Sequence, residues 1–311
     1  MTVVVVGSRA SHLARAQVAE CLAPLRRRFP RIVFRHRVVA ESADRDRRTA
    51  LAEVSRAANG AAFSSAQEAA LLAKEVDVVV HSFKDLPATP TPGLVLLAPP
   101  GREDARDALC GSTLVGLPEG ARVGTSAPRR IAQLLAVRPD LRMVPIRGNV
   151  SPRLARTRGT GGLDAVVLAA AGLRRLGRTA DIGELLPVEP FTPSPAQGAL
   201  GIQIRADDTT LHDLLADLGD PEVDVRVRAE RAVLTALRSG CDLPLGAHAR
   251  IRGDGSLSLT ARVTALDGTR EIAVIATGPA TSPETLGHTV AADLLRHGAG
   301  PLLDAVRPVA T

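Results

Sequence analysis

Residues 76–87 read Val-Asp-Val-Val-Val-His-Ser-Phe-Lys-Asp-Leu-Pro, an apolar run that passes into polar residues. Residues 76–80, four valines and one aspartate, predict a buried strand that ends at His81. A second such run, at 2–6, is followed by a helix that Ser11 can cap. Strands alternating with helices are typical of an α/β layer with a mainly parallel sheet, whose ligand crevice lies beyond the carboxyl ends of the strands. The polar residues after the strand are therefore predicted to line such a crevice.

The same alternation continues along the chain and then occurs a second time. Residues 31–39 predict another strand of the first layer, and 199–204 could rejoin the same sheet. Prolines concentrated at 87–100, and again at 190–195, predict two crossings between domains. Between the crossings a second α/β domain is predicted, with strands at 122–124, 142–146 and 165–169 and helices at 129–137 and 151–157.

The last third of the chain predicts a small α+β domain. Asp220 and Pro221 supply the N-cap and first-turn proline of a helix with one apolar face, formed by Val225, Ala229, Ala232, Val233, Ala236 and Leu237. Three short strands and a helix follow it, at 247–251, 257–264, 271–276 and 282–295. The prediction is thus an α/β protein with three domains, namely 1–98 together with 197–216, 99–196, and 217–311.

The composition limits the class of ligand. The chain has 311 residues and a formal net charge of +6, and its only lysines are Lys74 and Lys84, so arginine supplies the basic surplus. Guanidinium groups bind carboxylates and phosphates through two hydrogen bonds, which suits a polyanionic small molecule as well as a nucleic acid. With five Phe and no Tyr or Trp, binding of single strands by base stacking is disfavoured. For most of these arginines, compositional bias on a solvated surface is the alternative explanation.

The cysteines and the apolar runs indicate in which cellular compartment the protein is expected. Cys21, Cys110 and Cys241 are an odd number without metal-ligand spacing, so neither a disulfide framework nor a zinc or other metal site is predicted. A reducing compartment, the cytoplasm, fits best. The apolar start at 1–6 is interpreted as a first strand rather than a leader, and no run approaches the roughly 20 residues of a membrane span.

Asp85 is the first candidate for chemistry. It stands beside Lys84 where the predicted strand 76–80 has ended. A carboxylate kept ionised by a neighbouring cation can steady a developing positive charge or pass a proton to a leaving amine. The alternative is a surface loop in which Asp85 only caps a helix end and Lys84 is solvated.

A second candidate is a group of arginines at junctions between strands and helices. Backbone N–H groups and the helix dipole favour anions at helix N-termini, and an arginine beside them adds a bidentate partner. Because the junctions fall in two predicted domains, an anionic ligand between those domains would explain them; surface bias is the alternative. The junctions hold Arg9 with Ser11, Arg129 and Arg130 after Gly124-Thr125-Ser126, Arg147, and Arg153.

The third candidate is Cys241, which lies in the Gly-flanked loop Ser239-Gly240-Cys241-Asp242 after a long predicted helix. A cysteine in such a loop can act as a nucleophile or as a covalent attachment point. A lone cysteine is more often a small buried apolar residue, and this is the interpretation for Cys21 and Cys110.

Taken together, these segments resemble the hydroxymethylbilane synthase, or porphobilinogen deaminase, family over nearly the whole chain. Several ordered blocks at compatible spacing are more specific than any single motif. The blocks are Gly7-Ser8-Arg9-Ala10-Ser11, His81 to Pro87, Arg102 to Asp107, Gly124-Thr125-Ser126 with Arg129-Arg130, Arg147-Gly148-Asn149-Val150, Asp164 through Gly177, Gln197-Gly198-Ala199 and Gly240-Cys241.

The resemblance implies three domains, of which the first two are like periplasmic binding proteins with a cleft between them. It implies a dipyrromethane cofactor attached to Cys241, stepwise condensation of four porphobilinogen molecules with loss of ammonia, and release of linear hydroxymethylbilane. The small-molecule substrate is then porphobilinogen, with no nucleic-acid or membrane partner, and the implied state is a monomer. Each pyrrole carries an acetate and a propionate, so the growing chain needs an arginine-lined cleft.

The family's site residues carry over position by position. Asp85 would be catalytic and would steady the cationic azafulvene intermediates. Phe63 would form the apolar wall near the reacting ring. The cofactor would be held by Cys241, Lys84, Ser82, Thr125, Arg129 and Arg130, and the substrate by Arg9, Ser11, Phe63, Arg147 and Arg153.

The chain also departs from the family pattern in loops over the predicted cleft. Gly60 and Ser65 stand where the family usually has lysines, and 41–46 replace a Thr-Arg-Gly-Asp-like segment. Ala127-Pro128 and Ala196 replace Ser-Leu and Gly. Such changes bear on turnover, chain-length control and the pyrrole substrate more than on the fold.

Three alternatives therefore stay open. The first is a paralogue with an altered pyrrole substrate. The second is a non-catalytic anion-binding protein on the same fold, against which the retained Cys241 speaks, because pure binding needs no covalent anchor. The third is a basic nucleic-acid binder, although no recognised nucleic-acid motif is present.

Overall fold

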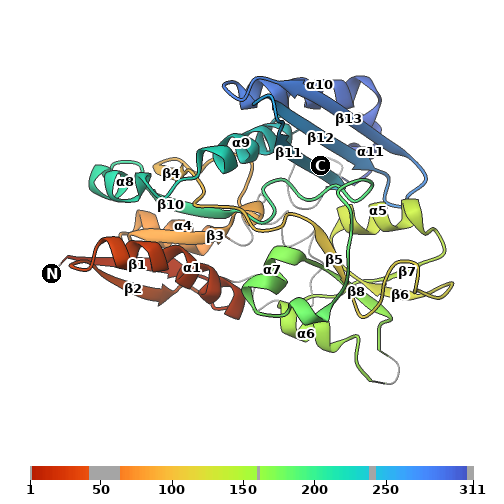
Figure 1. The fold of residues 1–311 in the computed structure, drawn as a ribbon, viewed down its shortest axis with the longest axis horizontal. Helices are drawn as coiled ribbons and strands as arrows, with labels where there is room; N and C mark the ends of the chain where they lie inside the picture. The colour runs from red at the N-terminus through yellow and green to blue at the C-terminus, as the bar shows by residue number, and fades with distance from the viewer. Residues whose placement is uncertain (1, 42–63, 160–161, 238–242, 307–311) are drawn as a thin grey trace, which may run out of the picture. The chain divides into compact units, whose positions relative to one another are not determined.

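The computed structural model describes residues 2–41, 64–159, 162–237 and 243–306. It divides into two compact units, one formed by 1–103 with 198–224 and the other by 104–197 with 225–311. Two five-stranded sheets and one three-stranded sheet organise the described residues (Figure 1). The predicted mixed α/β class is thus confirmed, whereas the predicted domain boundaries stay a prediction.

The first unit is built on one mixed sheet with the order β2-β1-β3-β10-β4. Strand β1 is parallel to β2 and β3, and β10 is antiparallel to both β3 and β4. The prediction that 199–204 rejoins this sheet is confirmed by β10. The strands are β1 (Val3–Ser8), β2 (Val33–Val38), β3 (Val78–Ser82), β4 (Leu94–Leu97) and β10 (Leu200–Arg205).

Strand β4 was not predicted from the sequence. It lies in the proline-rich stretch 87–100, which indicates a crossing between domains and not a strand. The stretch Leu94–Leu97 pairs with β10 at the edge of the sheet. Prolines flank this short strand but do not interrupt it, and edge strands are where nearby prolines are tolerated.

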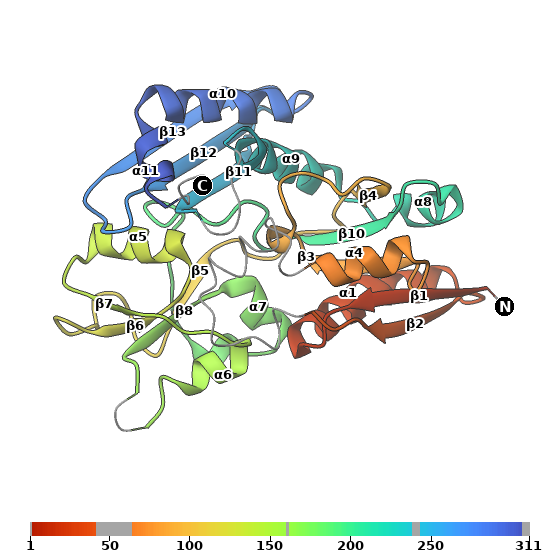
Figure 2. The same ribbon diagram turned by 180° about the vertical axis from the view of Figure 1, so that it is seen from behind.

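Helices cover both faces of this sheet because alternate residues of a strand point to opposite faces. Val78 and Val80 share a core with Leu22 and Leu25 of α1, whereas Val79 packs with Leu71 of α4 on the other side. Helix α4 lies on the face seen in Figure 2. The helices are α1 (His12–Arg28), α4 (Ser65–Leu72) and α8 (Thr209–Ala216).

The N-terminus of α1 is set by Ser11, as predicted. Its hydroxyl oxygen accepts the N–H of Ala14 at 3.1 Å, which satisfies a donor that has no partner inside the helix. The helix continues through Pro24 and ends at Arg28. Cys21 is buried in its apolar face, and burial, together with the nearby charge of Glu20, raises the pKa of this thiol to about 12.

The second unit contains a sheet of the same design, with the order β7-β6-β8-β5-β9. Strand β6 is parallel to β7 and β8, and β5 is antiparallel to β8 and β9. In both sheets a single antiparallel strand thus lies next to the third parallel strand. The elements are β5 (Asp107–Cys110), β6 (Arg122–Gly124), β7 (Arg142–Val144), β8 (Ala165–Ala169), β9 (Ile182–Leu185), α5 (Pro128–Val137), α6 (Val150–Ala155) and α7 (Ala170–Arg175).

The three-stranded antiparallel sheet belongs to the second unit. Helix α10 packs on β12 and β13, and α5 also contacts β12, so both faces of this central strand are buried. The elements are α9 (Pro221–Ala236), β11 (Leu245–Ile251), β12 (Leu257–Thr264), β13 (Glu271–Gly278), α10 (Pro283–Arg296) and α11 (Ala299–Asp304).

The predicted apolar face of α9 was wrong at two positions. Val225 is only half-buried and Ala236 is exposed, whereas Val223 and Val227 are buried. The buried face also holds the carboxylate of Glu230. Because Glu230 interrupts the apolar periodicity, the predicted apolar face is rotated around the helix axis relative to the face that is buried. The start of α9 is as predicted, because the Asp220 carboxylate accepts the N–H groups of the first turn.

None of the helices in the described ranges combines the length and apolar character that a membrane crossing requires.

Candidate functional site

The loop that carries Asp85 is fixed by two buried apolar side chains. Strand β3 ends at Ser82 and continues as a 3-10 turn, Phe83–Asp85. The Phe83 N–H donates to the carbonyl of Ala199 at 3.1 Å, and Leu86 returns its N–H to Phe83. Because the side chains of Phe83 and Leu86 are buried, the residues between them are left half-buried at the end of the strand.

Arg9 and Asp85 lie together at this edge of the first sheet. Their strands β1 and β3 are parallel neighbours, so the residues that follow them emerge side by side. The Arg9 Nη1 is 3.8 Å from the Asp85 Oδ2, and the two side chains are 21% and 29% exposed. Ser82 is tied to α1, because its Oγ is 2.8 Å from the Gln17 Nε2. Arg9, Ser82 and Asp85 thus lie at one end of the first sheet, and the prediction that they line a ligand crevice stays a prediction.

A buried polar chain stands behind this loop. The carboxylate of Glu68 accepts from the Gln203 Nε2 at 2.9 Å, which leaves the Gln203 Oε1 to face the His81 Nε2 at 3.0 Å. Burial lowers the pKa of His81 to about 4; the hydrogen bond to Gln203 opposes the shift and the charge of Arg9 adds to it. The neutral His81 ring therefore donates from Nε2 to the Gln203 Oε1. This hydrogen bond holds the ring in one orientation.

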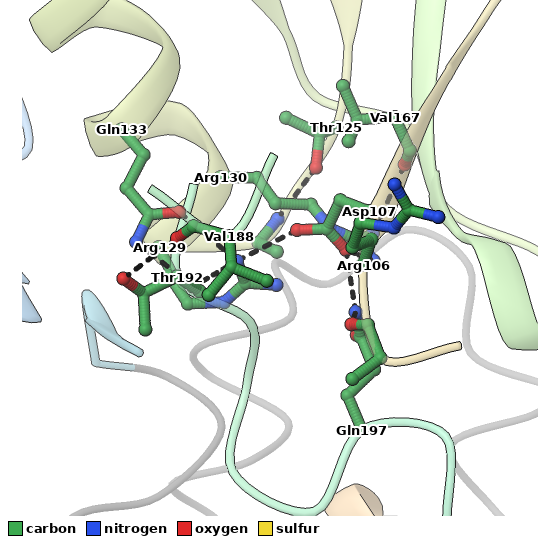
Figure 3. A network of polar contacts seen from close by, with 12 residues as sticks. Arg106, Asp107, Thr125, Arg129, Arg130, Gln133, Val167, Val188, Thr192 and Gln197 are labelled. Atoms are coloured by element: carbon green, nitrogen blue, oxygen red, sulfur yellow. Dashed lines mark hydrogen bonds and ion pairs between the residues drawn. The ribbon is translucent and has the colours of Figure 1, made fainter. Parts of the chain in front are cut away.

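In the second unit, Asp107 joins the two arginines at the start of α5 (Figure 3). Its Oδ2 lies 2.8 Å from the Arg129 Nη1, and its Oδ1 accepts from the Arg130 Nη2 at 2.7 Å. All three side chains are buried. Burial alone would raise the pKa of Asp107, but the guanidiniums of Arg129 and Arg130 hold it well below its usual range. The carboxylate is thus a permanent counterion.

Neutral groups complete this network. The Gln197 Nε2 donates to the Asp107 Oδ1 at 2.9 Å. The carbonyl oxygen of Thr192 accepts from the Arg129 Nη1 at 2.9 Å and from the Gln133 Nε2 at 3.1 Å. In Figure 3, Gln133 and Thr192 lie beside Arg129, whereas Gln197 lies next to Asp107. The arginine pair is therefore fixed from several segments of the second unit.

Glu230 anchors the segment that carries Gln197. Its carboxylate accepts the N–H of Ala196 at 2.7 Å and that of Ala249 in β11 at 2.8 Å. Ala196 has a φ of +60°, in the left-handed region where a side chain is disfavoured. The resemblance places glycine at this position, and here the buried hydrogen bond to Glu230 holds an alanine in the same conformation.

A hydrogen bond ties Arg153 to the turn that follows Arg147. The Arg153 Nε donates to the carbonyl of Gly148, the neighbour of Arg147, at 2.7 Å. Gly148 has a φ of +106°, a conformation open to glycine. The Ser126 Oγ donates to the Ile146 carbonyl at 2.7 Å, so the loops after β6 and β7 are joined as well.

The other predicted residues are distributed as follows. Thr125 is fully buried, and its Oγ1 accepts the N–H of Ala127, the residue that precedes α5. Lys84 is half-buried between Phe83 and Asp85. Ser65 begins α4. Cys241, Phe63 and Gly60 lie outside the described residues.

Glu41, one of the departures from the family pattern, acts as a cap. Its carboxylate Oε1 accepts the N–H groups of Ala66 and Gln67, at 2.9 and 3.4 Å, and its Oε2 accepts from the Ser65 hydroxyl at 3.3 Å. Burial raises the pKa of Glu41 even though these hydrogen bonds oppose the shift. Glu41 therefore closes the N-terminus of α4 in place of Ser64, whose side chain makes no capping bond.

Sequence reasoning missed the supporting residues. Asp107 and Gln197 stand in quoted family blocks, but no role was given to them, and Glu68 and Gln203 were not singled out. The only available signal was the presence of polar residues within apolar runs, such as Gln203 in Leu-Gly-Ile-Gln-Ile. Such a residue at a buried strand position needs a polar partner, which the sequence does not name.

Comparisons with known proteins match most of the chain. Residues 4–213 match the family model described as "Porphobilinogen deaminase, dipyromethane cofactor binding domain", and 225–296 match "Porphobilinogen deaminase, C-terminal domain". The porphobilinogen deaminase of Desulforudis audaxviator is 44% identical over 307 residues, which cover 98% of either chain. That of Deinococcus radiodurans is 41% identical over 311 residues, covering 99% of this chain and 100% of the relative.

Among solved structures, the BenM effector binding domain with benzoate is 12% identical, with a TM-score of 0.42 over 70% of this chain and 90% of that chain. An arginine-specific periplasmic binding protein of Salmonella typhimurium is 13% identical, with a TM-score of 0.38 over 70% and 92%. These likenesses are too distant to carry a conclusion. The two family models and the identity to full-length relatives do carry one: the chain belongs to the porphobilinogen deaminase family.

Proposed function

We propose that this protein is a hydroxymethylbilane synthase, which condenses four porphobilinogen molecules head to tail and releases ammonia and a linear tetrapyrrole. Membership of the porphobilinogen deaminase family supports the activity. The structural observation that supports this activity is the Arg9–Asp85 pair at the end of a parallel strand. Loss of an amine leaves positive charge on the substrate. A carboxylate that is partly exposed to the ligand can stabilise this charge.

Asp85 is the proposed catalytic residue. The primary amine of porphobilinogen is already protonated at neutral pH, so it can leave as ammonia with the electron pair of the C–N bond, and the carbon that it leaves becomes electron-poor. An ionised carboxylate next to that carbon stabilises the positive charge. The Arg9 Nη1 faces the Asp85 Oδ2 at 3.8 Å, and Phe83 and Leu86 fix the backbone on both sides.

The residues of the second unit fit the dipyrromethane cofactor. A dipyrromethane carries acetate and propionate groups, and bound through the sulfur of Cys241 it supplies the primer to which pyrroles are added. Arg129 and Arg130 bring two positive charges to a buried cluster in which Asp107 supplies one negative charge. The positive surplus matches a carboxylate ligand. We assign Lys84, Ser82 and Thr125 to the same cofactor.

The substrate carboxylates are assigned to Arg9, Ser11, Arg147 and Arg153, with Phe63 as the apolar wall. The hydrogen bond from Arg153, in α6, to the carbonyl of Gly148 supports the pairing of Arg147 and Arg153, since it ties the start of this helix to the turn that follows Arg147. Two guanidiniums from one strand-to-helix junction suit a pyrrole with two acidic arms.

The setting in the cell is a further part of the proposal. We infer that the protein works as a monomer in the cytoplasm, on small-molecule substrates and without a nucleic-acid or membrane partner. The family resemblance supports this setting, as does the need to keep Cys241 as a thiol until the cofactor is attached.

The test is the intact mass of the purified, denatured protein before and after porphobilinogen is added. The expected result is a chain that carries one dipyrromethane and then gains single pyrrole units. Cys241→Ser is expected to stay unmodified, whereas the control Cys21→Ser, a change inside α1, should be modified as the wild type is. A wild-type chain that gains no pyrrole mass under these conditions would contradict the proposed function.

A further inference from the structure

We infer that Asp107 is a positioning residue for the cofactor: its carboxylate fixes the guanidiniums of Arg129 and Arg130 in the orientation in which they receive the cofactor's carboxylates. The inference rests on the proposed function, because it assumes that these arginines hold the dipyrromethane. It concerns a residue that contacts the arginines and not the cofactor, so Asp107 acts through its neighbours.

The geometry divides the two oxygens of Asp107 between the two arginines. Oδ2 takes the Arg129 Nη1 at 2.8 Å. Oδ1 accepts from the Arg130 Nη2 and Nε, at 2.7 and 3.1 Å, and from the Gln197 Nε2 at 2.9 Å. Because each oxygen serves a different guanidinium, a single side chain sets the position of both. An acceptor with a single oxygen offers no equivalent geometry.

The charges explain why a carboxylate is needed at this point. Two adjacent buried guanidiniums repel one another, and the Asp107 charge between them removes this repulsion. The other described partners are the carbonyls of Thr192 and Val167 and the amides of Gln133 and Gln197, which are neutral. One positive charge is therefore left over in the cluster. A carboxylate ligand supplies the missing negative charge.

The backbone contacts limit how far the arginines can move. The Arg129 Nη1 donates to the carbonyl of Thr192, and the Thr192 Oγ1 accepts from the Arg262 Nε of β12 at 3.2 Å. The Arg130 Nη1 donates to the carbonyl of Val167 in β8 at 3.1 Å. Asp107 thus completes a rigid frame that reaches from the mixed sheet to the three-stranded sheet of the second unit. Rigid frames of this kind reduce the ordering that ligand binding requires.

Asp104 provides a matched control within the same unit. Its carboxylate also bridges two arginines, Arg106 at 2.7 Å and Arg174 at 3.0 Å. These two arginines are 37% and 40% exposed, and neither belongs to α5. Asp104→Asn therefore removes the same charge and the same number of ion pairs as Asp107→Asn, away from the proposed cofactor arginines.

The experiment compares Asp107→Asn, Asp107→Glu, Asp104→Asn and the wild type, each made as full-length apoprotein in cells that form no porphobilinogen. The melting temperature is measured by circular dichroism. The rate at which each apoprotein acquires the dipyrromethane from added porphobilinogen is followed by intact mass and divided by the folded fraction. Asp107→Glu keeps the charge but moves the carboxylate by one methylene, so it tests position separately from charge.

The expected result is that Asp107→Glu folds and acquires the cofactor at least about tenfold more slowly than the wild type, with Asp107→Asn slower still. Asp104→Asn should differ from the wild type by less than about twofold. Acquisition by Asp107→Glu at the wild-type rate per folded molecule would overturn the inference, and so would an equal defect in Asp104→Asn. A wild type that acquires no pyrrole mass at all is a different result, and it overturns the proposed function.

Discussion

The guanidinium of Arg9 lies 3.8 Å from the carboxylate of Asp85, across the ends of two parallel strands of one sheet. Seventy-odd residues separate the two side chains along the chain, and the parallel pairing of β1 with β3 brings them together. Both side chains keep about a quarter of their surface exposed, so a ligand can reach them. This partial exposure is what the proposed catalytic role of Asp85 requires.

Asp85→Asn is expected to slow ammonia release about a hundredfold or more, because the neutral amide does not balance the positive charge that develops on the substrate carbon. The melting temperature should change little, since the Asp85 side chain is 29% exposed. Asp254→Asn, in an exposed hairpin turn, is the control and should keep full activity. A near-normal rate in Asp85→Asn would contradict the catalytic assignment.

Arg147→Ala is expected to raise the KM for porphobilinogen about tenfold or more, because a charge-assisted hydrogen bond to a substrate carboxylate is lost. Steady-state kinetics with measured melting temperatures check this expectation. Arg142→Ala is the control, because Arg142 is exposed on β7 and is not assigned to the substrate. Equal KM values for Arg147→Ala and the wild type would remove Arg147 from the substrate site.

The stability of the fold should fall as the pH drops from about 6.5 to about 4. The His81 pKa is lowered from 6.5 to about 4 by burial, so in this range the unfolded chain binds a proton that the folded chain does not. Each pH unit within the window costs up to about 1.4 kcal/mol of unfolding free energy. Urea unfolding at pH 7, 6, 5 and 4 measures this dependence.

His81→Gln is expected to make the stability less dependent on pH in this window, since the titrating ring is gone. His288→Gln, an exposed position on α10, is the control and should keep the wild-type dependence. If the His81→Gln and wild-type profiles have the same slope, the buried histidine is not the group responsible.

Gly268→Ala should destabilise the second unit by clearly more than Gly255→Ala. Both glycines have a positive φ in hairpin turns of the three-stranded sheet, which costs alanine about 1 kcal/mol at either position. A Cβ at Gly268 would lie 2.4 Å from the backbone of Leu135 and Ala136 in α5, whereas a Cβ at Gly255 meets nothing within 4 Å. The clash adds about 1 to 3 kcal/mol, which denaturant unfolding resolves. Equal losses of unfolding free energy in the two variants would show that a Cβ at Gly268 does not clash with α5.

The sequence by itself determined the elements whose signal is local. The apolar runs at β1 and β3, the cap at Ser11 and the N-terminal Asp220-Pro221 signal each depend on neighbouring residues only. Each element forms, although β1 and β3 extend beyond the C-terminal ends of their predicted ranges, 2–6 and 76–80. The short strands β5 and β9 were missed because four residues give little periodicity. Their pairing partners decide that they are strands.

The tertiary structure alone decided which polar residues meet. Asp107 and Arg130 are 23 residues apart, and His81 and Gln203 are 122 residues apart, so no local pattern predicts either contact. The sequence located arginines at helix N-termini, but it did not reveal the carboxylate between them. Burial removes water as a partner, so each buried charge or amide must find a counterpart in the fold, and only the packing of the strands determines which residue that is.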